Sequence, residues 1–198
     1  MHQPLGPLNA LYPTPAVLVG ALVNSRPNFI TIAHVGILTH THLSLGIAKV
    51  HYTNDGIREN KTFSICLPSE NLMVETDYCG IMTGKNTDKA ALFDVFYGEL
   101  KTAPMIRECA LCMECRLDRV VDYPKHDVFV GEIVQTHAKS EALRDGLPDV
   151  EKIRPLLFDM SRKEYFGLGR SVGRSVGRSV GRSVGRCWNA GKQLKNPK

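Results

Sequence analysis

Three regularly spaced cysteines are the first residues in the sequence whose types could do chemistry. Cys109, Cys112 and Cys115 stand in the stretch ECALCMECR with the spacing C-x2-C-x2-C, which is typical of iron–sulfur and zinc sites. A ferredoxin-like cluster would need a fourth cysteine soon afterwards, but RLD follows Cys115. On a strand, Cys109 and Cys115 would share one face and Cys112 would point to the other. We therefore predict strand thiols and no metal site.

A second group of residues, between positions 46 and 89, could form an anion site. A predicted strand ends in KVHYT, and Thr53 is placed to cap a helix whose first N–H groups would face an anion. The turn TGKNTDK then precedes another predicted helix. The side chains that could bind a phosphate here are those of Lys49, His51, Tyr52, Thr53, Lys85 and Lys89. The G-x4-G-K-[ST] spacing of a Walker loop is absent, so we do not expect a nucleoside triphosphate.

Two further features have a reactive and an ordinary interpretation. His40 and His42 in LTHTH could share one side of a strand or loop, but zinc would need two more ligands there. We expect a polar loop at this position. Cys79 in DYCG could be a reactive thiol beside a helix end, and we favour plain packing.

The elements that must position these residues are mostly strands. Apolar or alternating segments rich in β-branched residues are separated by Gly, Pro, Asn or Ser. The predicted strands cover residues 15–23, 29–38, 42–48, 61–67, 109–123 and 127–138. Helical patterns begin at Thr53, Ser69 and Thr87. Many strands and few helices predict a mainly β fold, a barrel with short peripheral helices.

The composition favours a chain that folds as one domain with an appendage. The chain has 198 residues, of which 43 % are hydrophobic, enough for a substantial core. No apolar run approaches the roughly 20 residues that cross a bilayer, and no basic segment precedes the apolar stretch near the N-terminus, as it would in a signal peptide. We expect a cytoplasmic protein with reduced thiols and no membrane partner.

The basic charge of the chain is concentrated in a tandem repeat. Residues 170–186 contain four SVGR units, and without their five arginines the formal charge falls from +5 to 0. Glycine in every fourth position makes a poor helix, so we interpret this segment as a loop or linker. An arginine array that attracts phosphates is the alternative. No aromatic residue for base stacking precedes Trp188, and nucleic acid is therefore not the expected partner.

Four short motifs, taken in order, resemble the flavoredoxin branch of the flavin reductase-like proteins. They are T-x-A at 31–33, HYT at 51–53, F-S-x-x-L-P-S at 63–69 and DYCG…TGK…DK…F at 77–93. The resemblance spans roughly residues 10–168 and resumes at 187–192 in CWNAGK. It implies an FMN-binding split β-barrel, Greek-key-like, that forms a homodimer with flavin sites near the interface. The domains would then be 1–168 for the barrel, 169–186 for the repeat and 187–198 for a tail of the same barrel.

The resemblance also implies a set of flavin-binding residues. Along the ring it places Thr31, Ala33 and His34, and beside the ring Asp77, Tyr78 and Gly80. Backbone groups of Gly46, Ile47, Ala48 and Lys49 would bond the polar edge of the ring or the ribityl chain. The ribityl phosphate would meet His51, Tyr52, Thr53, Lys85 and Lys89. Cys66 stands where relatives often carry an amide, and a thiol is a weaker hydrogen-bonding group.

The function that follows is that of a flavoredoxin-like redox protein, which carries electrons or hydride through non-covalently bound FMN. An NAD(P)H-dependent flavin reductase with exchangeable FMN is the alternative, so the chain would be a flavin-dependent oxidoreductase served by a partner protein or a nicotinamide. No G-x-G-x-x-G fingerprint of a separate nicotinamide domain is present. No catalytic residue is assigned: His34 either orients a hydride donor and tunes the flavin, or is a polar wall residue. A non-enzymatic barrel that binds phosphate ligands or nucleic acid is the rival from another class.

Overall fold

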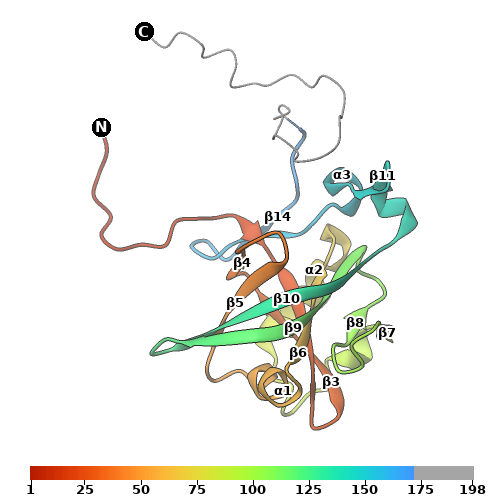
Figure 1. Ribbon diagram of the computed structural model, residues 1–198. Helices are drawn as coiled ribbons and strands as arrows, with labels where there is room; N and C mark the ends of the chain where they lie inside the picture. The colour runs from red at the N-terminus through yellow and green to blue at the C-terminus, as the bar shows by residue number, and fades with distance from the viewer. Residues whose placement is uncertain (172–198) are drawn as a thin grey trace. The chain divides into compact units, whose positions relative to one another are not determined.

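The computed structural model describes residues 1–171, and Met1–Leu168 form one compact unit (Figure 1). The predicted linker at 169–186 and tail at 187–198 lie, apart from residues 169–171, outside the described residues. In the part of the chain that the structure describes, no helix has the length and hydrophobicity needed to cross a membrane.

One antiparallel sheet of seven strands forms the body of the protein. Its strand order is β3-β2-β6-β9-β10-β5-β4. The strands are β2 (Val17–Val23), β3 (Arg26–Ile32), β4 (Val35–Ile37), β5 (His42–Ala48), β6 (Thr62–Leu67), β9 (Leu111–Asp122) and β10 (His126–Ala138). β9 and β10 are the longest and cross the whole molecule as one hairpin (Figure 1).

The sheet curls into a barrel because its two edge strands are consecutive in the sequence. Only Ala33 and His34 separate β3 from β4, yet these strands stand at opposite ends of the strand order. The chain bends at these two residues and brings the end of β3 to β5, where Gly46 N donates to His34 O at 2.8 Å. The end of β3, the first strand in the order, therefore meets β5 near the other end of the order, and the curled sheet closes there.

Short elements cover the ends and the outer face of the barrel. The helices are α1 (Thr53–Asn60), α2 (Met73–Ile81) and α3 (Val150–Ile153), with single 3-10 turns η1 (Glu70–Leu72), η2 (Ala90–Leu92) and η3 (Ser140–Ala142). Small sheets pair β1 (Thr14–Pro15) and β14 (Glu164–Phe166) with β13 (Leu157–Asp159), β7 (Val95–Phe96) with β8 (Met105–Ile106), and β11 (Leu143–Arg144) with β12 (Leu147–Pro148).

Most of the expected elements are confirmed, but two helix starts differ. The strand predicted at 42–48 is β5, and the long hairpin turns between β9 and β10 as expected. Tyr52, not Thr53, is the N-cap of α1 and makes no capping bond. The helix predicted from Thr87 is wrong: Asp88 Oδ1 accepts from Ala90 N and Ala91 N, and only the single turn η2 forms before the chain enters β7.

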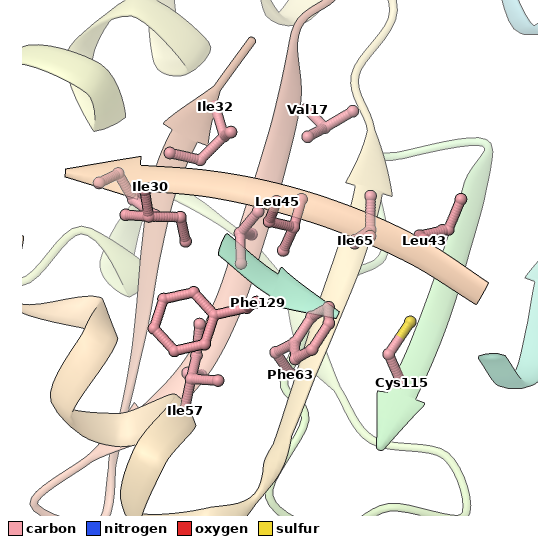
Figure 2. Close-up of a cluster of buried hydrophobic side chains, with 13 residues drawn as sticks. Val17, Ile30, Ile32, Leu43, Leu45, Ile57, Phe63, Ile65, Cys115 and Phe129 are labelled. Atoms are coloured by element: carbon pink, nitrogen blue, oxygen red, sulfur yellow. The ribbon is translucent and has the colours of Figure 1, made fainter. Parts of the chain in front are cut away.

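Two cores lie on opposite faces of the sheet because side chains alternate along each strand. Figure 2 shows the core inside the barrel, where aliphatic side chains surround Phe63 and Phe129. The outer core packs the alternate residues, among them Leu18 and Cys66, against α2 and the segment that contains β7 and β8. Both phenylalanines inside the barrel are fully buried, which indicates a well-filled interior.

The cysteines of the C-x2-C-x2-C stretch divide between these cores, but not as predicted. Cys112 belongs to the outer core and Cys115 to the inner one, as strand alternation requires. Cys109 lies in the outer core with Cys112, whereas we expected it to share a face with Cys115. The reason is that β9 begins only at Leu111, so Cys109 stands in the preceding turn, where strand alternation does not apply.

Candidate functional site

Two adjoining polar cavities lie where β3, the start of α1 and the segment after α2 meet. Their volumes are about 270 and 240 Å3, and both are lined by Tyr52 and Gly84. The larger is completed by Val23, Arg26, Pro27, Asn28, Lys85, Asn86, Thr87 and Asp88. The smaller is completed by Ile30, Val50, His51, Thr53, Gly80, Ile81, Met82, Thr83 and Lys89. The structure thus brings the predicted residues of the HYT and TGK motifs to one place.

Arg26 and Lys85 give the larger cavity its positive charge. Both side chains are exposed, and neither forms an ion pair with another residue among positions 1–171. An unpaired guanidinium and ammonium beside amide and hydroxyl groups suit an anionic oxygen ligand. The sequence reasoning named Lys85 but missed Arg26. Its position at the start of the strand that carries the T-x-A motif was the available signal.

Lys89 has a different role from that expected for a phosphate partner. It is only 3 % exposed, and its ammonium donates to the carbonyl oxygens of Cys79 and Met82, both at 3.1 Å. These carbonyls lie at the C-terminal end of α2, where a cation is favourable. Burial lowers the pKa of Lys89. The side chain therefore fixes the end of α2 against the smaller cavity.

His51 is held in its neutral form on the wall of the smaller cavity. Burial is the main cause that lowers the pKa of this imidazole below 6.5, and the nearby Lys89 and His126 lower it further. At neutral pH the residue therefore offers one donor and one acceptor and no charge. It can hydrogen-bond a ligand but not neutralise one.

The start of α1 satisfies two of its backbone N–H groups within the chain. Asn54 N donates to His51 O at 3.2 Å and Asp55 N to Tyr52 O at 3.3 Å. Thr53 is 1 % exposed, and its Oγ1 accepts from Asn28 Nδ2 at 2.7 Å. The helix start therefore presents fewer free donors to an anion than the sequence suggested, and the side chains of the cavity carry more of that role.

The residues predicted to lie along a flavin ring line the bend between β3 and β4. The Thr31 hydroxyl donates to the Thr76 carbonyl of α2, and Gly80 of the same helix faces Thr31. Ala33 is nearly buried. His34 is exposed, with Nε2 at 3.1 Å from the Tyr12 hydroxyl.

Other predicted residues face elsewhere. Cys66 is fully buried in the outer core, and Ile47 points into the barrel. The Lys49 ammonium pairs with Asp122, and Gly46, Ile47 and Ala48 pair with β10 along the strand ladder. Of the residues beside the ring, Asp77 Oδ1 accepts from the Tyr165 hydroxyl at 3.1 Å, and Tyr78 is half-buried on α2.

A third, apolar cavity of about 960 Å3 opens between the start of β2 and β4. Its lining includes Val17, Val35, Ile37, Ile65 and His40, so His40 borders an apolar mouth. His42 Nδ1 lies at 3.2 Å from Thr39 Oγ1 and 3.0 Å from Thr41 Oγ1. Among residues 1–171, no group of three or more His, Cys, Asp or Glu could hold a metal ion.

Comparison with known proteins assigns the family. A family model described as the flavin reductase like domain matches residues 9–167. The chain therefore belongs to the flavin reductase-like family, and this membership supports a flavin cofactor and a flavin-related redox function. The predicted resemblance and the predicted mainly β split barrel are both confirmed.

Two of the similar solved structures are flavoredoxins. The chain is 36 % identical to the flavoredoxin from Methanosarcina acetivorans, with a TM-score of 0.86 over 98 % of this chain and 99 % of that one. It is 33 % identical to the flavoredoxin of Desulfovibrio vulgaris (Miyazaki F), with a TM-score of 0.82 over 92 % and 100 % of the two chains. An uncharacterized protein of Archaeoglobus fulgidus is 32 % identical over 148 residues, which cover 72 % of this chain and 82 % of that protein.

Proposed function

We propose that this chain is a flavoredoxin-like protein that carries electrons or hydride through non-covalently bound FMN. The observation that supports this most directly is the pair of adjoining cavities between β3, α1 and α2, in a chain of the flavin reductase-like family. The relatives with the highest identity among the solved structures compared above are themselves flavoredoxins. The sequence contains no G-x-G-x-x-G motif, which would indicate a separate nicotinamide-binding domain.

The residues present fit a phosphorylated, partly apolar ligand. Arg26 and Lys85 would hold the phosphate, with Asn86 and Thr87 as further hydrogen-bonding groups. Next to them, Val50 and Ile81 are 85 % and 71 % exposed on the rim of the smaller cavity. A ligand with a charged tail and a flat aromatic end would neutralise the cations and cover the apolar rim in one binding event.

The chain itself has to bind and orient the flavin, which supplies the hydride and electron chemistry when bound. The bond from the Thr31 hydroxyl to the Thr76 carbonyl joins β3 to α2 and so builds one wall of the site. The neutral His51 would donate or accept one hydrogen bond without adding charge. Lys89 keeps the end of α2 in place beside the ligand. None of these roles requires a general acid or base.

Two activities remain within this proposal, that of an electron carrier and that of a flavin reductase. Visible spectra recorded after separate additions of dithionite and NAD(P)H distinguish them. The purified protein should be yellow or take up added FMN, and the released flavin should be FMN in one-to-one ratio. Bleaching of the flavin absorbance by dithionite alone supports an electron carrier that is served by a redox partner protein. Bleaching by NAD(P)H as well supports the flavin reductase. A colourless protein that takes up no FMN contradicts both.

The rival from another class is a non-enzymatic barrel that binds phosphate ligands or nucleic acid. It would bind a polyanion and remain colourless, and its affinity would fall steeply with salt concentration.

Arg26→Ala and Lys85→Ala should each weaken FMN binding about tenfold or more, as expected when a hydrogen bond to a charged group worth about 1.5–3 kcal/mol is lost. Lys152→Ala is the control, since this exposed lysine of α3 donates to Leu143 O of β11 and lines neither cavity.

A homodimer is part of the proposal, because apolar side chains are exposed beside the cavities. Val74 and Ile81 of α2 are 68 % and 71 % exposed and lie seven residues apart, on one face of the helix. A second copy covering this face would bury them next to the ligand. Light scattering should give twice the 22.0 kDa of one chain, and Val74→Asp should shift the mass toward the monomer. A monomeric native protein would contradict the dimer without affecting the FMN proposal.

A further inference from the structure

Three cysteines meet in the outer core, away from the cavities described above. Cys66 and Cys112 are direct partners across β6 and β9, and Cys109 reaches them from the turn before β9. The Cys112 thiol donates to Ile106 O at 3.4 Å, and all three cysteines pack in the same buried cluster. All are free thiols, and none is more than 4 % exposed.

Two of these thiols border a small surface cavity. The cavity has a volume of about 190 Å3 and is lined by Phe96, Arg107, Cys109, Ala110, Cys112, His137, Ala138 and Lys139. Cys66 is not part of the lining and is fully buried behind Cys112. A small polar reagent that enters the cavity would therefore meet Cys109 and Cys112, but not Cys66.

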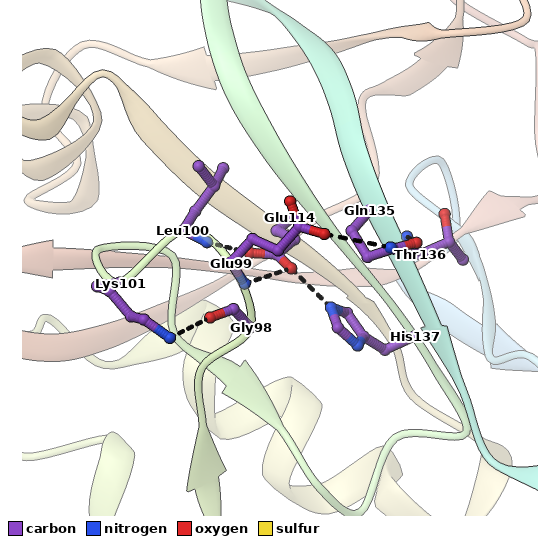
Figure 3. Close-up of polar contacts among 8 residues, drawn as sticks. All are labelled: Gly98, Glu99, Leu100, Lys101, Glu114, Gln135, Thr136 and His137. Atoms are coloured by element: carbon purple, nitrogen blue, oxygen red, sulfur yellow. Dashed lines mark hydrogen bonds and ion pairs between the residues drawn. The ribbon is translucent and has the colours of Figure 1, made fainter.

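A buried carboxylate fixes an imidazole at the same cavity. Figure 3 shows Glu114 of β9, which is fully buried, accepting from Glu99 N at 3.0 Å and Leu100 N at 2.6 Å. His137 Nε2 lies 2.7 Å from Glu114 Oε1, and His137 is the register partner of Cys112 in β10. The ring of His137 therefore has a fixed place in the lining of the cavity that Cys109 and Cys112 border.

We propose that Cys109 and Cys112 form a reversible disulfide when a hydroperoxide enters this cavity. The Cys109 sulfur attacks a peroxide oxygen, the O–O bond breaks, and the thiol proton leaves with the departing oxygen as water or alcohol. The Cys109 sulfenic acid is then attacked by the Cys112 sulfur, which forms the S–S bond and releases the oxygen as water with the second thiol proton. The two sulfurs lose two electrons and the peroxide gains two. A dithiol reductant reverses the step by exchange.

The location of Cys109 favours this pair over Cys66 and Cys112. Cys109 stands in a turn, so its backbone can adjust to the geometry of a disulfide, whereas Cys66 is fixed in the ladder between β2 and β9. The neighbouring Cys112 thiol lowers the pKa of Cys109, although burial keeps that pKa above its ordinary value. Cys109 is thus the better attacking thiol, and the reaction should be slower than that of an exposed low-pKa thiol.

The test uses the full-length chain with Cys187→Ser, a substitution that removes the cysteine outside the described residues and leaves five thiols. The protein is treated with excess hydrogen peroxide, blocked with iodoacetamide under denaturing conditions and digested with trypsin. Cleavage after Arg107 and Arg116 yields the peptide ECALCMECR, which contains Cys109, Cys112 and Cys115. We expect this peptide to carry one blocked cysteine and one disulfide. Its mass should therefore be 2 Da below that of the same peptide with one blocked cysteine and two free thiols. Fragmentation on both sides of Met113 should place that cysteine at position 115. Dithiothreitol should restore five thiols.

Control variants and the opposite outcomes keep the proposal falsifiable. Cys109→Ser and Cys112→Ser should each abolish the 2 Da loss, while Cys115→Ser, which changes the inner core, should retain it. A cross-linked peptide that joins residues 62–85 to ECALCMECR would show a disulfide to Cys66 or Cys79 instead and overturn the assignment. Oxidation only to sulfinic acid, or no oxidation at all, would overturn it as well. No readout depends on flavin binding, so the result stands apart from the proposed function.

Discussion

Lys85 and Lys89 show how the fold gives similar side chains different roles. In the sequence both flank one turn and would be equal partners for a phosphate. In the structure Lys85 is exposed on the cavity wall, whereas Lys89 is buried against two carbonyl groups of α2. The positive charge of this segment could be predicted from the sequence. Which of the two ammonium groups remains free for a ligand is decided by tertiary contacts.

Replacing Lys89 should therefore affect stability more than charge. In Lys89→Met the carbonyls of Cys79 and Met82 lose their shared donor, which we expect to cost about 1–3 kcal/mol of unfolding free energy. Urea unfolding followed by circular dichroism measures this. Lys85→Ala is the matched comparison and should unfold like the native protein, within about 0.5 kcal/mol. Equal losses in both variants would show that the two lysines have the same role.

Glu114 should make the stability of the protein depend on acid pH. Burial by itself would raise the pKa of this carboxyl, but the bonds from His137, Leu100 N and Glu99 N outweigh it and lower the pKa below 4.5. A lowered pKa in the folded state means that the stabilisation is present above pH 4.5 and is lost as pH falls through the folded value.

The variant Glu114→Gln tests this dependence. At pH 7 it should lose about 1.5–3 kcal/mol, because hydrogen bonds to a charged acceptor are replaced by weaker ones. The difference from the native protein should shrink as the pH falls below 4.5, in urea titrations at several pH values. Glu141→Gln, an exposed change, should show no such trend. A difference that is constant with pH would contradict the assignment.

At the scale of elements, α1 depends on a close approach to the barrel. Gly56 lies where a Cβ would fall well inside van der Waals contact with the Leu22 carbonyl oxygen of β2. No movement of a flexible side chain could relieve this contact, because the obstacle is backbone.

Gly56→Ala should therefore destabilise the protein although alanine favours helices. We expect a loss of about 1–3 kcal/mol from overpacking, measured by thermal or urea unfolding. Glu59→Ala, on the exposed side of the same helix, is the control and should change stability little. A Gly56→Ala protein at least as stable as the native one would show that α1 can shift away from β2 at no cost.

The elements that could be predicted from the sequence are those with a clear period. The alternation of β5 and the two long runs of β9 and β10 determined their ends to within two residues. Three local predictions failed for physical reasons that the sequence hides. Thr53 bonds to Asn28 rather than capping α1, the turn that Asp88 caps ends at Leu92 as the chain becomes extended at Phe93, and Cys109 precedes the strand that was expected to contain it.

At the scale of the whole molecule, the candidate flavin site lies entirely within Met1–Leu168. The order of the motifs was sufficient to predict the barrel through the resemblance to the family, and the motifs fall on β3, the start of α1, β6 and α2. It was not sufficient to find Arg26, which reaches the site only through the pairing of β2 with β3.

Removal of the repeat should therefore leave the site intact. A chain without residues 171–182, which contain three of the SVGR units, should bind FMN with nearly unchanged affinity, measured by fluorescence quenching of the flavin. The full-length chain at high salt is the control for general electrostatic attraction. A large loss of affinity on deletion would mean that the arginines take part in binding.

The closure of the barrel at His34 and Gly46 has a consequence for its motions. Only three residue pairs join β4 to β5, whereas β9 and β10 are paired over eleven. Opening should begin at this short ladder on the edge of the sheet, which borders both the bend after Thr31 and the apolar cavity that Val35 lines. A ligand bound across the bend would hold β4 and β5 together. Deuterium should therefore exchange into the Gly46 amide quickly in the protein without ligand and far more slowly with the ligand bound.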